Sequence, residues 1–412
     1  MSNTPSPTCR SCGADGLIPV LDLGRTPLAN SLLTSEQLNK PEDNYPLEVV
    51  FCPACTLVQI TETVPPEVLF RDYLYFSSFS DTMLSHAETL VDQVLREREL
   101  GGESLAVEVA SNDGYLLQYY KRCGVPVLGI EPARNVARVA VEERGIRTVT
   151  EFFGEKLAGE LAAQGEQADV LHANNVLAHV SDLNDFVTGV RHMLKRDGVA
   201  VIEVPYVKDL VDRCEFDTIY HEHLCYFSLT ALDILFRRHQ LQINNVERIA
   251  IHGGSLRITV GHSGVAPQSP AVAALLEEER DWGVRDPEFY GKFCARVERL
   301  KSELGGLLAD VKAKGARIAA YGAAAKGSTL LNYFKIGRET IDFVADRSTY
   351  KQGRYLPGVH IPIVPTEQLV NEMPDYVLLL TWNFASEILE QQAEYRRRGG
   401  RFILPVPDVR VV

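Results

Sequence analysis

Apolar positions along this chain change their spacing several times, and each spacing predicts a different kind of element. Between Asp81 and Leu100 they recur every three or four residues, for example at Met83, Ala87 and Leu90, which predicts an amphipathic helix. From residue 105 onward, short apolar runs alternate with helical patterns, as in a doubly wound α/β domain. The runs that we expect to form strands lie at 105–110, 125–130, 146–149, 168–173 and 199–204.

The same alternation returns in the C-terminal part of the chain. An acidic helical region, Ala271 to Ala313, precedes it. At the other end of the chain, the residues before Ser77 contain several prolines and show little helical periodicity. We therefore expect an α/β protein of three units: a small N-terminal module (1–77), a central Rossmann-like domain (78–260) and a C-terminal Rossmann-like domain (261–412). The strands expected in the last unit lie at 317–322, 341–345, 376–380 and 402–404.

The charge of the chain limits its partners. The 412 residues carry a formal net charge of −13, and no cluster of Lys and Arg offsets it. Such a protein repels phosphate backbones, so nucleic acid is disfavoured as a partner. The first residues lack the pattern of a signal peptide, and no apolar run is long enough to span a bilayer. We expect a cytoplasmic protein without membrane contact, either a monomer or a small homo-oligomer.

Four of the eight cysteines form two closely spaced pairs, Cys9-x-x-Cys12 and Cys52-x-x-Cys55. Thiolates are ligands that tetrahedral zinc prefers, and a two-residue spacer lets both sulfurs of a pair reach one ion. With all four positions taken by protein, the zinc would be structural. The remaining cysteines are scattered, and we expect all of them to be small buried core residues: Cys123, Cys214, Cys225 and Cys294.

The first strand of the central domain leads into a loop of small and polar residues. This loop (108–114) lies where ligands collect in doubly wound folds, and Glu131 ends the next strand about twenty residues on. A carboxylate there can accept hydrogen bonds from both ribose hydroxyls, although it could instead only cap the strand end. The loop is not G-x-G-x-x-G and has no Lys for phosphates, so a cofactor with ribose but no phosphate, S-adenosylmethionine (SAM), fits better than a nicotinamide. The cofactor-binding residues that we expect are Glu108, Ala110, Asn112, Gly114 and Glu131, with Phe152 and Phe153 after the third strand and Asn174 and Asn175 after the fourth.

The densest group of proton-transferring side chains lies in residues 216–224, after the strand that ends near Val204. Side chains two positions apart point in nearly opposite directions on a helix, so we do not expect His221 and His223 to chelate one ion. We interpret one of them as a base that faces the site and the other as structural; a surface cluster of polar groups is the alternative. An imidazole has a pKa suited to removing a proton next to a carbonyl, which turns that carbon into a nucleophile.

These motifs occur together in one order and cover nearly the whole chain. The two Cys pairs, the loop 108–114, the segment Tyr220-His221-Glu222-His223 and the later segment 321–326 resemble the zinc-containing, SAM-dependent sugar C-methyltransferases of antibiotic deoxysugar pathways. The resemblance implies a zinc module, a class I methyltransferase domain and a C-terminal Rossmann-like domain. It also implies methylation of a dTDP-linked 4-keto-deoxysugar at C-3, with C-5 as the alternative, through an enolate. It assigns the base to His223 and no catalytic role to His221, and it places around the base Tyr220, Glu222, His179 and Tyr75.

A strand-to-helix turn of small residues opens the C-terminal domain at 321–328. Its backbone could contact a pyrophosphate at the helix N-terminus, so we expect this domain to assist sugar-nucleotide binding. Two alternatives remain at this point: a nucleotide-sugar oxidoreductase or epimerase that holds NAD(P) here, and a zinc-ribbon module that only binds a partner. The substrate-binding residues that we expect are His252, Tyr321, Gly322, Lys326, Lys351 and Arg354, of which the last two could equally be ordinary surface charges.

Overall fold

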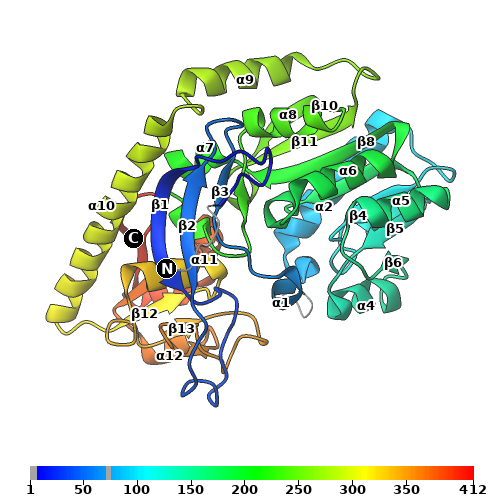
Figure 1. Ribbon diagram of the computed structural model, residues 1–412. Coiled ribbons are helices and arrows are strands. Elements are labelled where there is room, and N and C mark those ends of the chain that lie inside the picture. Colours follow the sequence, from blue (N-terminus) through cyan, green and yellow to red (C-terminus); the bar gives the residue numbers. More distant parts are fainter. Residues whose placement is uncertain (1–6, 71–75) are drawn as a thin grey trace.

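The computed structural model describes residues 7–70 and 76–412, with Phe70 and His252 described only by their backbone. Within these ranges the chain forms a four-, a seven- and a six-stranded sheet, one for each of the three expected units (Figure 1). The expected α/β fold with a small N-terminal module is therefore confirmed. No helix within the described ranges is both long enough and apolar enough to cross a bilayer.

The N-terminal module is built on an antiparallel sheet that the sequence did not lead us to expect. Leu21 and Leu23 of its first strand are buried, while Asp22 between them and Gly24 after them are exposed, which is the alternation of a half-buried strand. The fourth strand comes from the central domain, so the module and that domain share one sheet. In spatial order the strands are β1 (Ile18–Thr26), β2 (Tyr45–Phe51), β3 (Val58–Ile60) and β9 (Cys225–Tyr226), and a short helix, α1 (Pro66–Phe70), follows the first three in the chain.

The central sheet has a parallel part, as expected, and an antiparallel edge that was not expected. Strands β8, β7, β4, β5 and β6 run parallel, while β11 and β10 form a hairpin that pairs antiparallel with β8. The hairpin lies at the end of the sequence range expected for this domain (78–260), and it adds two strands to the sheet beyond β8. In spatial order the strands are β10 (Leu241–Ile249), β11 (Ser255–His262), β8 (Leu194–Pro205), β7 (Ala168–Asn174), β4 (Ala106–Val109), β5 (Val127–Ile130) and β6 (Thr148–Val149).

Three helices of the central domain, α2, α6 and α8, begin at side-chain caps that satisfy free backbone amides. Asp182 accepts hydrogen bonds from two amides of α6, and Ser80 and Ser228 cap α2 and α8 in the same way. Together these helices fix the loops at the carboxyl ends of the parallel strands. The helices are α2 (Asp81–Arg98), α3 (Leu117–Arg122), α4 (Arg134–Glu142), α5 (Glu155–Ala163), α6 (Leu183–Met193), α7 (Val207–Asp212) and α8 (Leu229–Arg238).

The acidic helical region is divided into two helices, α9 (Pro270–Trp282) and α10 (Pro287–Ala313). Gly283 ends the first helix in the left-handed conformation, and Asp286 caps the second, whose first residue is proline. The long helix α10 lies along the outside of the N-terminal and C-terminal sheets (Figure 1).

The C-terminal domain is a mostly parallel sheet with helices, as expected. The domain lies below the N-terminal sheet in the view of Figure 1, and α11 begins after the short turn that follows β12. In spatial order the strands are β14 (Ile363–Val364), β13 (Val344–Ala345), β12 (Ile318–Tyr321), β15 (Tyr376–Leu379), β16 (Arg401–Leu404) and β17 (Arg410–Val411), with helices α11 (Ala325–Phe334), α12 (Gln368–Glu372), α13 (Ala385–Gln391) and α14 (Ala393–Arg397).

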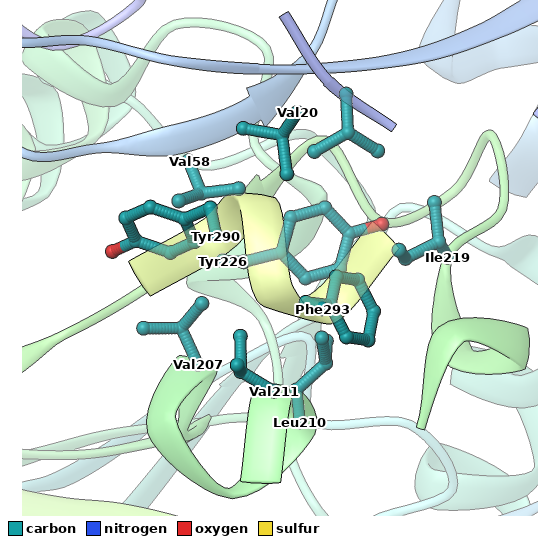
Figure 2. A pocket seen from close by; sticks show the side chains of 10 residues that line it. Val20, Val58, Val207, Leu210, Val211, Ile219, Tyr226, Tyr290 and Phe293 are labelled. Carbon is teal, nitrogen blue, oxygen red and sulfur yellow. The ribbon is translucent and has the colours of Figure 1, made fainter. Parts of the chain in front are cut away.

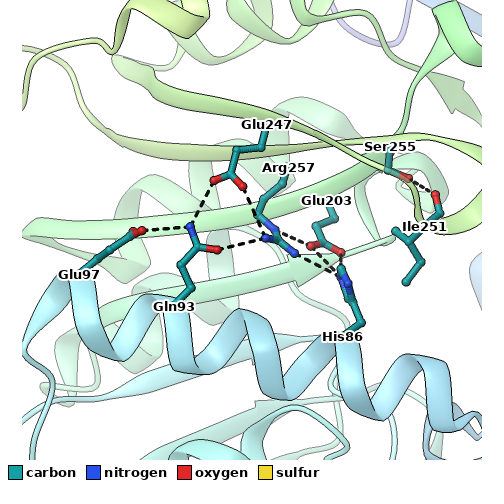
Figure 3. Close-up of polar contacts among 8 residues, drawn as sticks. All are labelled: His86, Gln93, Glu97, Glu203, Glu247, Ile251, Ser255 and Arg257. Atoms are coloured by element: carbon teal, nitrogen blue, oxygen red, sulfur yellow. Dashed lines mark hydrogen bonds and ion pairs between the residues drawn. The ribbon is translucent and has the colours of Figure 1, made fainter.

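A buried ion network ties α2 to the central sheet (Figure 3). Glu203, near the end of β8, has a fully buried side chain that accepts hydrogen bonds from Arg257 of β11 at 2.7 Å and from His86 of α2 at 2.9 Å. Burial alone would raise the pKa of Glu203, but the hydrogen bonds and charges of His86 and Arg257 together hold it below its usual value. Glu203 therefore stays charged in the core.

We expect Arg257→Met to lower the free energy of unfolding by about 3–5 kcal/mol, because it leaves a buried carboxylate without its permanently charged partner. Arg237→Met, which removes an exposed partner of Asp233, should cost less than about 1 kcal/mol. Urea unfolding at neutral pH measures both. The stability from Glu203 should be lost as the pH falls through its lowered folded-state pKa, because protonation ends the pairing. Equal stabilities for the two variants would contradict this assignment.

Candidate functional site

The four paired cysteines converge on one point in the N-terminal module. Their sulfur atoms all lie within 4.8 Å of one another, with Cys9 and Cys55 3.4 Å apart and Cys12 and Cys52 3.6 Å apart. Four sulfurs around a zinc ion at about 2.3 Å would lie at similar separations, so the donor set fits tetrahedral zinc. The other expectation for cysteines holds only in part: Cys214 and Cys225 are buried and Cys294 is half-buried, but Cys123 is exposed at the end of α3 and the prediction for it is wrong.

The expected cofactor loop has an unusual backbone. Ala110, Asn112 and Gly114 all adopt positive φ, at 52°, 50° and 77°, directly after β4. Positive φ is costly for Ala and persists only where the surroundings impose it, often at ligand sites. At Gly114 a side chain would also collide with Ile146, because an added Cβ would lie 2.5 Å from its Cδ1 atom. The backbone of the loop therefore packs directly against Ile146 at this position.

Several buried oxygens at the carboxyl edge of the central sheet have no hydrogen-bond partner among the described residues. They belong to Glu108 of β4, Ser111 of the loop, Asn174 of β7 and Asn175, which directly follows β7. Burial, with the nearby carboxylates of Asp113 and Glu131, raises the pKa of Glu108. Unsatisfied acceptors are rare in protein interiors, so this cluster fits a ligand rich in donors and positive charge. SAM, with its hydroxyls, ammonium and sulfonium, is such a ligand.

Glu131 lies at the carboxyl end of β5, as expected, and already holds the loop together. One carboxylate oxygen accepts the amide hydrogen of Asn112 at 2.9 Å and the other accepts that of Ala133 at 2.8 Å. Each oxygen has a second lone pair, so the carboxylate can still accept from hydroxyls. The two aromatic residues expected beside it differ: Phe152 is exposed, whereas Phe153 packs edge-to-face against Phe186 of α6.

The expected catalytic segment places His223 between two other candidates. Nδ1 of His223 lies 2.7 Å from the carbonyl oxygen of Thr218, and Nε2 lies 2.8 Å from the hydroxyl of Tyr220. A carbonyl only accepts hydrogen bonds, so Nδ1 carries the proton and Nε2 of the neutral ring is the basic atom, which accepts from Tyr220. The ring of His179, from η2 (Leu177–His179), lies 4.8 Å from that of His223 and meets it edge-on.

Residues from all three units hold this segment. From the N-terminal module, Asn30 donates to the Glu222 carboxylate at 2.7 Å, and the carbonyl of Pro46 accepts from His221 at 3.1 Å. His221 therefore contacts the module while His223 contacts His179, so the two rings face different neighbours, as expected. From the C-terminal domain, Trp382 donates to Asp217 at 2.7 Å.

Burial shifts the titration of the groups around His223. It lowers the pKa of His179 to about 4, so this ring is neutral at physiological pH. It raises the pKa of Glu222 to about 7, although the hydrogen bond from Asn30 opposes the shift. A carboxyl that titrates near neutrality can donate or accept a proton in the working pH range.

The residues expected to contact the substrate phosphates are engaged with protein. The Lys326 ammonium donates to Asn383 at 3.0 Å, and the Lys351 ammonium donates to the carbonyl of Ala323 at 2.8 Å. The Asp346 carboxylate accepts the Ala323 amide hydrogen, one of the amides that a pyrophosphate could have used. Arg354 reaches the carbonyl of Leu32 in the N-terminal module at 3.5 Å, and Tyr321 and Gly322 are buried at the end of β12.

Two expected site residues cannot be placed. Tyr75 lies outside the described residues, and His252 is described only by its backbone in η4 (Ile251–Gly253). Sequence reasoning, in turn, missed Asn30, Thr218 and Trp382 as neighbours of the site. Asn30 and Trp382 lie in no motif and come from other units, so no sequence signal could have found them. Thr218 lies inside the predicted segment, but it acts through its backbone carbonyl.

Comparisons with known proteins agree with this architecture. Residues 9–70 match a family described as a putative zinc binding domain, 85–246 a methyltransferase domain and 250–407 a C-methyltransferase C-terminal domain. The chain is 38% identical over 409 residues to C-methyltransferase NovU of Streptomyces niveus, covering 99% of this chain and 97% of that protein. A ubiquinone biosynthesis O-methyltransferase of Roseobacter denitrificans is 35% identical over 98 residues, which is 23% of this chain and 38% of that one. Among solved structures, magnesium protoporphyrin IX methyltransferase of Synechocystis PCC 6803 is 11% identical with a TM-score of 0.35, covering 48% of this chain and 89% of that chain.

Proposed function

The chain belongs to the C-methyltransferase family and is a SAM-dependent enzyme, and from this premise we propose that it methylates a nucleotide-linked 4-keto-deoxysugar. The nucleotide is dTDP, and the reacting carbon is the one next to the ketone, C-3 in preference to C-5. The reaction takes place in the cytoplasm. Membership of this family favours methyl transfer over both the nicotinamide-dependent alternative and a module that only binds a partner.

The observation that carries this proposal is the state of the His223 ring. Its Nδ1–H is held by the Thr218 carbonyl, which leaves Nε2 as a base on the side of Tyr220 and His179. Carbon methylation needs such a base, because a sugar carbon becomes nucleophilic only after it has lost a proton next to a ketone.

In the proposed mechanism, His223 removes the proton from the carbon next to the ketone. Tyr220 donates to Nε2 in the free enzyme and moves aside or relays the proton when the sugar binds. His179 stays neutral and adds no positive charge next to the imidazolium that forms. Bound SAM supplies an electrophilic methyl group on a sulfonium. Glu108, Asn112, Glu131, Asn174 and Asn175 would hold this cofactor through their side chains, with Ala110 and Gly114 providing close backbone approach and Phe152 or Phe153 the adenine contact.

Glu222 is proposed to stabilise the oxygen of the enolate. Asn30 donates to one of its carboxyl oxygens, so the proton of the neutral acid lies on the other, which can donate to the developing oxyanion. We propose that the nucleotide binds at the C-terminal domain, through Tyr321, Gly322 and the backbone of the following turn, together with Lys326, Lys351 and Arg354. His252, from the central domain, is proposed to contact it as well. Tyr75 would complete the group around the sugar. The zinc held by the four cysteines is structural and takes no part in the reaction.

Mass spectrometry of dTDP-4-keto-6-deoxysugars incubated with the protein and SAM tests the proposal. We expect a product heavier by one methylene group, with loss of one deuterium from substrate labelled at the reacting carbon. Turnover of NAD(P)H with no methylated product would contradict it.

The pH dependence tests the role of Glu222. Because burial raises its pKa to about 7, the acid loses its proton as the pH rises through that value, and kcat should fall on the alkaline side. Glu222→Gln keeps a donor but does not titrate, so its kcat should be lower and should not fall near pH 7. A variant with the same alkaline limb as the wild-type enzyme would exclude this role for Glu222.

A further inference from the structure

The tautomer of His223 depends on one backbone carbonyl, that of Thr218. This carbonyl accepts from Nδ1 at 2.7 Å and so fixes which nitrogen is basic. Thr218 belongs to a short 3-10 turn, η3 (Phe216–Thr218), in which its amide and its hydroxyl both bond to the carbonyl of Glu215. A turn of this length has little stability of its own, so other contacts must fix the direction of the carbonyl.

Both neighbours of Thr218 are bonded to the C-terminal domain. On one side, the carboxylate of Asp217 accepts from Nε1 of Trp382 at 2.7 Å; Trp382 opens η5 (Trp382–Phe384) after strand β15. On the other side, the carbonyl of Ile219 accepts from the hydroxyl of Thr329 in α11 at 3.2 Å. The turn is thus held at two points by another domain.

Apolar packing fixes the same segment. The side chain of Ile219 lines a small apolar pocket between α7, α10 and the N-terminal sheet, together with Leu210 and Phe293 (Figure 2). Ile219 is 1% exposed and Asp217 is fully buried, so neither residue can move without disturbing the core.

The charge beside Asp217 explains why a carboxyl is tolerated there. The Lys326 ammonium lies 4.7 Å from the centre of the Trp382 ring and interacts electrostatically with Asp217 and Glu215. Burial raises the pKa of Asp217 to about 6, while the Lys326 charge and the Trp382 hydrogen bond oppose that shift. Lys326 and Trp382 therefore act together on one buried carboxylate next to Thr218.

We propose that Trp382 of the C-terminal domain is a positioning residue for proton abstraction, acting through Asp217 and the Thr218 carbonyl on the His223 ring. The inference rests on the proposed function and extends it, since it gives the C-terminal domain a part in the chemistry and not only in nucleotide binding. Removing the Trp382 N–H frees one end of the turn, so the Thr218 carbonyl no longer holds Nδ1 in one direction. The hydrogen bond from Nδ1 to this carbonyl becomes weaker, so the imidazolium form of His223 is less stabilised.

The test is Trp382→Phe, which keeps a ring over Lys326 but removes the N–H donor. With the sugar nucleotide that the wild-type enzyme methylates, kcat should fall by up to about 100-fold, as expected for a small displacement of a catalytic group. KM for SAM should not change. The acidic limb of the kcat profile should move to lower pH, because a less stabilised imidazolium has a lower pKa.

The matched control is Trp282→Phe, in the other tryptophan of the chain, which lies on α9 and packs against Tyr206 and Lys208. It should leave kcat and its pH profile unchanged. Thr329→Val removes the hydrogen bond to the Ile219 carbonyl, and it is the second variant to test if Trp382→Phe does not fold. It should shift the acidic limb of the kcat profile in the same direction by a smaller amount. Asp217→Asn, which still accepts from Trp382, should retain more activity than Asp217→Ala.

A Trp382→Phe enzyme with the wild-type kcat, or with a lower kcat and an unmoved acidic limb, would overturn the positioning role. A wild-type enzyme that transfers no methyl group to any 4-keto sugar nucleotide would contradict the proposed function instead, so the two failures can be told apart.

Discussion

Replacement of His223 by asparagine will abolish measurable methyl transfer and leave SAM binding intact. The asparagine amide can still donate to the Thr218 carbonyl, as Nδ1 does, but the chain then has no basic nitrogen in the position of Nε2. General-base catalysis contributes about 10²- to 10⁴-fold, so kcat should fall at least that far. Turnover is measured by mass spectrometry of the sugar and SAM binding by calorimetry.

The matched control for this substitution is His221→Gln. Nε2 of His221 donates to the Pro46 carbonyl in the N-terminal module, and a glutamine amide can make the same bond. This variant should keep kcat close to that of the wild-type enzyme. A His223→Asn enzyme with undiminished kcat, or one that no longer binds SAM, would show that the base has been assigned to the wrong residue.

Loss of the zinc will unfold the N-terminal module and inactivate the enzyme. The sheet of this module is small, and structural zinc contributes about 10–16 kcal/mol in modules of this kind. Because Asn30 and Pro46 hold Glu222 and His221, unfolding of the module also removes support from the catalytic segment. We expect Cys55→Ser to lose its zinc, to melt at a much lower temperature and to have no activity.

Zinc content by mass spectrometry and melting by circular dichroism provide the measurement. Cys123→Ser is the matched control, since its thiol is exposed and far from the zinc cysteines in sequence, and it should resemble the wild-type protein in both respects. A Cys55→Ser protein that binds no zinc yet melts and turns over normally would show that the metal does not support the fold.

Much of the fold followed from local patterns. The period of the apolar residues gave the parallel strands and helices, because each of these elements buries one regular face. The hairpin of β10 and β11 and the sheet of the N-terminal module were missed. β1 is bent by irregular pairing, and β9, at two residues, is too short to show a period, while its partner β3 lies more than 160 residues earlier in the chain.

The candidate site was predictable only where its residues are neighbours in sequence. Tyr220 and His223, which the family resemblance places together, are bonded three residues apart. Asn112, in the loop after β4, is bonded to Glu131 at the end of the adjacent strand β5, and the spacing of the two strands sufficed to place both. Asn30 and Trp382 reach the same segment from 192 and 165 residues away. Their contacts depend on how the domains pack, which no local pattern encodes. The same holds for Lys326 and Lys351, which the sequence suggested as phosphate-binding residues. The packing of the domain places both ammonium groups against protein acceptors, and no local pattern shows this.

The most direct test of the account is hydrogen exchange at the reacting carbon in the absence of methyl transfer. The enzyme is loaded with S-adenosylhomocysteine, which has no methyl group to give, and incubated with the 4-keto sugar nucleotide in D2O. The account predicts that the wild-type enzyme introduces deuterium next to the ketone and that His223→Asn does so no faster than buffer alone. Equal exchange by the two proteins would contradict the claim that the imidazole of His223 activates the sugar carbon.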